Sequence, residues 1–103
     1  MADIETARRA LVVRLIEGLG RAAADLRRAA FENRGLPETL GALAEKVARD
    51  ARQVSEADFA AAKAAGFTED EVFEIVVCAA VGEATRQHDA ALAALEQVTW
   101  RRS

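Results

Sequence analysis

Two helix-start signals lie only 13 residues apart near the middle of the chain, and they constrain the fold more than any other feature. Ser55 is followed three residues later by Asp58, and Thr68 is followed three residues later by Glu71. Each hydroxyl can accept from the backbone N–H groups that a helix start leaves free, and Glu71 can reach back to the N–H of Thr68. Gly66 lies between the two pairs and suits the left-handed residue that ends a helix. The sequence therefore predicts a short helix, a tight turn and a long helix.

Composition and periodicity extend this prediction to an all-α protein. The chain has 103 residues, with abundant Ala, no Tyr and one Pro, which favours helix and fits one domain over residues 1–103. Its 51% hydrophobic and 30% charged residues are typical of a globular chain. Apolar positions at helical spacing predict a helical bundle of about four helices, over residues 4–33, 37–50, 56–64 and 69–98.

The first of these helices has two glycines near its middle. Ile4, Leu15 and Leu26 belong to one apolar stripe, which predicts a single long helix. Gly18 and Gly20 each weaken that helix by about 1 kcal/mol relative to Ala. A kink or break near residues 18–20 is therefore the alternative to a continuous helix.

The start of the last helix is apolar around almost its whole circumference. Between residues 72 and 81 the only polar side chain apart from the cysteine is Glu74. A chain of this size has few helices with which to cover such a segment on every side. We therefore expect a homo-oligomer whose interface includes one apolar set of this helix: Val72, Phe73, Val76, Val77 and Ala80.

The charge distribution argues against binding to nucleic acid. The net charge is −3, and it is divided into +2 for residues 1–35, −1 for residues 36–66 and −4 for residues 67–103. Residues 59–77 resemble a helix-turn-helix in outline, but the second helix would present four acids to phosphates. A basic first helix and an acidic last helix suit antiparallel packing within or between chains, although two separately solvated faces would give the same pattern.

The sequence also lacks membrane and secretion signals. No apolar run approaches the roughly 18 residues needed to span a membrane, and the charged N-terminus does not resemble a signal peptide. We therefore expect a cytoplasmic protein without membrane or nucleic-acid partners.

Three residues are the weak candidates for catalytic chemistry: Cys78, His88 and Glu74. Cys78 and His88 are the only thiol and imidazole, and on one helix they lie about 15 Å apart along the axis, so they can meet only across an interface. We expect Cys78 to be an inert core thiol, His88 a partly buried packing residue, and Glu74 an exposed acid one turn before Cys78. The chain shows no metal-ligand pattern, and we expect no metal and no cofactor.

A resemblance rests on the turn and the helices around it. The residues that carry it are Ala62, Gly66, Thr68, the acids at 69–71 and the apolar run over 72–81. With these residues, positions 36–95 resemble the alkylhydroperoxidase D-like (AhpD-like), or carboxymuconolactone decarboxylase-like, superfamily. The resemblance implies an all-α fold that is generally oligomeric.

The same resemblance places a Cys-x-x-Cys-x-x-x-His peroxidase motif just ahead of the turn in active members. Counting back from Gly66 puts Ala51 and Val54 at the two cysteine positions and Asp58 at the histidine position. The chain therefore lacks the CxxC motif, and the nucleophile, the resolving thiol and the proton relay are all replaced. The resemblance thus implies an oligomeric structural or small-molecule-binding protein that retains the scaffold. The alternatives are a peroxidase- or decarboxylase-type enzyme with a diverged inter-subunit site, and an accessory subunit of another catalytic chain.

Overall fold

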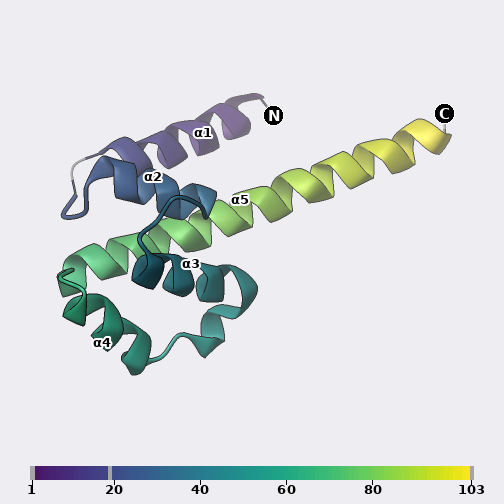
Figure 1. Cartoon of the computed structure of the whole chain (residues 1–103). Helices are drawn as coiled ribbons and strands as arrows, with labels where there is room; N and C mark the ends of the chain where they lie inside the picture. The colour runs from purple at the N-terminus through teal and green to yellow at the C-terminus, as the bar shows by residue number, and fades with distance from the viewer. Residues whose placement is uncertain (1, 19, 103) are drawn as a thin grey trace.

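The computed structural model describes residues 2–18 and 20–102, with side chains described for residues 6–16, 18 and 20–98. Over these residues the regular secondary structure is all helix, with no strand, which confirms the all-α prediction. The described residues form five α-helices and one 3-10 helix: α1 (Ala2–Glu17), α2 (Ala24–Glu32), α3 (Glu38–Asp50), η1 (Ala51–Gln53), α4 (Glu56–Ala64) and α5 (Glu69–Arg102). Figure 1 shows how the α-helices are arranged.

The predicted helix over residues 4–33 is two helices, so the count of four was too low. α1 ends at Glu17 and α2 begins at Ala24. The break therefore includes Gly18 and Gly20, where the sequence had indicated a break as the alternative to a continuous helix. Leu19, between those glycines, lies outside the described residues. A Cβ on Gly20 would overlap the carboxylate of Glu74, so a larger residue at this position would have to displace that side chain.

α5 is the central element, and the other helices pack along its first half. α2 and α3 lie against it, α4 crosses near its start, and α1 lies beside α2 (Figure 1). The buried core between them consists mainly of side chains from α2, α3 and α5, including Ala30, Leu40, Leu43, Val72, Ile75 and Cys78. The second half of α5 extends beyond the bundle, which makes the molecule 56 Å long and 28 by 21 Å across.

The turn between α4 and α5 forms as the sequence predicts. Gly66 has φ +107°, and its N–H donates to the carbonyl of Lys63, while Phe67 donates to the carbonyl of Ala62. This pair of bonds is the Schellman end of a helix. Thr68 and Glu71 then form the reciprocal capping box at the start of α5, with N···O distances of 2.8 and 3.2 Å.

The apolar start of α5 is covered by its own chain on more sides than the sequence suggested. Val72 is completely buried in the core, so it cannot belong to a subunit interface. Val76 and Val77 are partly buried, whereas Phe73 and Ala80 are exposed. Val72 is covered by side chains of three other helices, since it belongs to one buried cluster with Ala30 of α2, Leu40 of α3 and Ala62 of α4.

The end of α2 lies very close to α5 at Gly82. A Cβ at this position would overlap the backbone carbonyl of Phe31, at the end of α2. The guanidinium of Arg86 also donates to the Phe31 carbonyl, with Nη1 at 2.6 Å. The last turn of α2 is therefore fixed on α5 through backbone atoms that cannot move aside cheaply.

Gly82→Ala should lower the free energy of unfolding by about 1–3 kcal/mol, because the added methyl group forces the two helices apart. Urea denaturation of the purified variant measures this change. Gly41→Ala is the matched control, since a Cβ there meets its nearest neighbours at 3.8 and 3.9 Å and the substitution should raise stability by up to about 1 kcal/mol. Equal stability of the two variants would contradict the proposed close approach.

Candidate functional site

Glu74 is not the solvated acid that its surroundings in the sequence suggested. Its side chain turns from α5 toward the segment between α1 and α2, where Oε1 and Oε2 accept from the N–H of Arg21 at 2.9 and 2.8 Å. Oε2 also accepts from the N–H of Ala22 at 2.9 Å. A carboxylate at the start of α2 also has a favourable interaction with the helix dipole. Glu74 thus sets where the second helix begins.

Arg27 holds the same segment from the other side. Its side chain is only 6% exposed, and its guanidinium donates to the carbonyls of Leu15 and Gly18 at the end of α1. Its Nε is buried without a hydrogen-bond partner among the described residues. Gly20 lies directly between this guanidinium and the Glu74 carboxylate. We call Glu74, Arg27 and the backbone of residues 18–22 the α1–α2 clasp.

Cys78 lies behind the clasp and faces the core. It is fully buried, and burial raises the pKa of its thiol; the Glu74 carboxylate raises this pKa further, and Arg27 opposes both effects. A thiol with a raised pKa is protonated at neutral pH and is a poor nucleophile. Glu74, Arg27 and Cys78 together border a hollow of about 240 Å³, which Phe73 and Arg14 flank.

His88 is separate from this hollow and, contrary to expectation, exposed. It lies nearly three turns beyond Cys78 on α5, at the edge of an apolar groove of about 460 Å³ between α1 and α5. The groove is lined by Arg8, Leu11, Val12, Leu15, Val81, Ala84, Thr85 and His88. The structure thus brings Glu74 and Cys78 together and leaves His88 apart from both within one chain.

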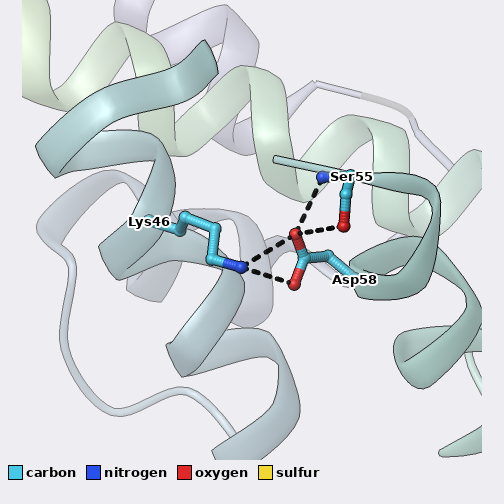
Figure 2. Close-up of polar contacts among 3 residues, drawn as sticks. All are labelled: Lys46, Ser55 and Asp58. Carbon is cyan, nitrogen blue, oxygen red and sulfur yellow. Dashed lines mark hydrogen bonds and ion pairs between the residues drawn. The ribbon is translucent and has the colours of Figure 1, made fainter. Parts of the chain in front are cut away.

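The three residues at the positions of the peroxidase motif are Ala51, Val54 and Asp58, and Val54 and Asp58 make contacts that stabilise the fold. Ala51 is exposed in η1, and Val54 packs against the core. Figure 2 shows Asp58 between Lys46 of α3 and Ser55 at the start of α4: its carboxylate accepts from Lys46 Nζ at 2.9 and 3.1 Å and from the Ser55 N–H at 2.8 Å. The Ser55 hydroxyl donates to it as well, at 3.2 Å. This ion pair joins α3 to α4.

Sequence reasoning missed Arg27 and Lys46 as important residues. Arg27 lies on the apolar side of its helix, four residues after Ala23 and three residues before Ala30. This position was the one feature of the sequence that could have indicated a buried arginine. Lys46 gave no signal, because its partner Asp58 is 12 residues away in another helix.

The described residues contain no group of three or more His, Cys, Asp or Glu side chains that could hold a metal ion. In the same part of the chain, no helix combines the length and apolarity needed to cross a membrane.

Comparisons of the chain with models of protein families, with curated proteins and with solved structures find no match. The AhpD-like resemblance therefore stays a prediction, and the candidate site is interpreted from its own geometry.

Cys78 should react slowly with iodoacetamide in the folded protein and quickly in urea, because burial both shields the thiol and keeps it protonated. Ala80→Cys in a Cys78→Ser background supplies a matched control, since position 80 is exposed on the same helix. Mass spectrometry of timed samples measures both rates. If the native Cys78 reacts as fast as the cysteine at position 80, the thiol is not inert.

Asp58→Asn should reduce stability at pH 7 more than at pH 3. The hydrogen bonds from Lys46 and Ser55 lower the pKa of Asp58 in the folded state, so the unfolded chain takes up the proton first as the pH falls. The stabilisation is present above about pH 5 and is lost as the pH falls through the lowered pKa. Urea denaturation at both pH values measures the difference, and Lys46→Gln should reproduce it. A loss that is equal at the two pH values would rule out the charged pair as its cause.

Proposed function

We propose that this chain is a self-associating helical protein, a structural or small-molecule-binding subunit of a homo-oligomer. The observation that carries the proposal is the second half of α5. It projects from the bundle with Leu92, Leu95 and Val98 exposed by 42%, 61% and 51%. An exposed row of large apolar side chains on an otherwise unsupported helix is typical of a protein interface.

A longer row on the same helix, which shares Leu95 and Val98 with the exposed set, has a spacing that suits pairing with another helix. Apolar or small residues recur at alternating intervals of three and four from Val81 through Ala84, Ala91 and Leu95 to Val98, with His88 as the one polar member. This spacing is typical of the seam of a coiled coil. A lone helix in water gains little stability, so partner contacts would stabilise the projecting half.

The exposed surface of α1 adds to the same face. Leu11 is 68% exposed on the edge of the groove between α1 and α5. At about 460 Å³ the groove also falls within the usual range of small-molecule sites. Association of two chains would bury Leu11 and cover the groove.

We further propose that the chain is an AhpD-like protein without the peroxidase motif, acting in the cytoplasm. The Gly66 turn and the capped start of α5 support the resemblance, and Asp58 at the histidine position is engaged by Lys46. A single cysteine is ordinary in a reducing compartment. The enzymatic alternative with a thiol site across subunits is less well supported, because burial keeps Cys78 protonated.

Light scattering should give the wild-type protein a native mass of two or more 11.1 kDa chains at tens of micromolar. Leu95→Glu places a charge within the apolar row and should shift the protein to monomer. Gln97→Glu is the matched control, because it adds the same charge on the opposite side of the helix and should leave the mass unchanged. A wild-type monomer would overturn the proposal.

A further inference from the structure

The groove between α1 and α5 and the projecting half of α5 are parts of one continuous surface. The groove floor is formed by Val81, Ala84 and His88, and the same row of side chains continues as Ala91, Leu95 and Val98. We call residues 89–98 the arm; every side chain in it is exposed. The chain therefore presents an open apolar groove and an exposed apolar helix on a single face of α5.

Two copies related by one two-fold axis can cover both the open groove and the exposed apolar helix. If two α5 helices pack antiparallel about a two-fold axis, the arm of each copy lies over the groove floor of the other, and both grooves are filled by identical contacts. A parallel pair would instead place arm against arm and leave both grooves open. The antiparallel arrangement is thus the one in which the groove and the arm complete each other.

The charges along these surfaces favour the same arrangement. Residues 6–16 of α1, which border the groove, contain three Arg and no acid. Residues 87–99, which include the arm, contain Asp89 and Glu96 and no Lys or Arg. Within one chain, Arg8 already contacts Asp89 at 3.4 Å, so α1 arginines do face acids of α5. Antiparallel exchange places the acidic arm beside the basic helix, whereas a parallel pair opposes like charges.

We propose that the arm of each protomer lies antiparallel in the α1–α5 groove of a second copy of this chain. This inference rests on the proposed self-association and names the segment and the surface that meet. Leu95 and Val98 of one copy bury Leu11 and Val81 of the other. Each interface contact occurs twice in the dimer, so a single substitution acts on both.

A disulfide between positions 11 and 95 tests this arrangement. Two proteins are made in a Cys78→Ser background, one with Leu11→Cys and one with Leu95→Cys, and they are mixed under mild oxidation. Each of these proteins has a single cysteine, so a disulfide can form only between two copies. The mixture should yield a covalent heterodimer with the 11–95 disulfide. Because the two variants have the same intact mass, the disulfide is identified by the mass of the linked peptide pair after proteolysis.

The possible outcomes distinguish a failure of the arm-in-groove arrangement from a failure of self-association itself. A wild-type dimer together with the 11–95 disulfide supports both. A wild-type dimer without this disulfide overturns the arm-in-groove arrangement and leaves self-association standing. A wild-type monomer overturns both.

A second variant measures the strength of the contact without altering the bundle. Leu95→Ser should weaken dimerisation by roughly a hundredfold or more, because each dimer loses two buried leucine contacts. Because position 95 lies outside the core, helicity of the bundle by circular dichroism should be retained. An unchanged dimer dissociation constant would overturn the arrangement.

Discussion

The α1–α2 clasp is the interaction on which the rest of the structure depends. Glu74 supplies acceptors to the free N–H groups before α2, and Arg27 supplies donors to the free carbonyls at the end of α1. A charged partner makes each such bond worth about 1.5–3 kcal/mol, although removing an arginine and a carboxylate from water offsets much of this gain. The result is a defined position for the break rather than a large stability. That position directs α1 along α5 and so creates both the hollow beside Cys78 and the groove beside His88.

The parts of the fold that could be predicted are those determined within a few residues of chain. The capping box of Thr68 and the left-handed Gly66 involve partners at most five residues away, and the pattern of those residues is sufficient to place the turn. The buried, inert state of Cys78 could also be predicted, because its neighbours on α5 are almost all apolar and burial is the main influence on the state of this thiol.

The parts that could not be predicted depend on contacts between distant residues. Glu74 meets Arg21 across 53 positions, so no local pattern could distinguish it from a solvated acid. Two glycines indicated a weak point in the first helix but could not decide between a kink and a break, since the decision depends on α5. The same limit applies to Val72 and His88: the cover over Val72 comes from other helices, and His88 is exposed because α1 leaves the groove open.

Contacts with α5 also determine the length of α2. Glu74 fixes the beginning of α2, and Gly82 and Arg86 fix its end at Phe31, so two helices running in the same direction are matched at both ends. One inserted residue in either helix would advance one end by about 1.5 Å and rotate it by about 100° relative to its partner. The length of α2 is therefore tied to the interval between these positions on α5, and insertions can be accommodated only in the loops or in the arm.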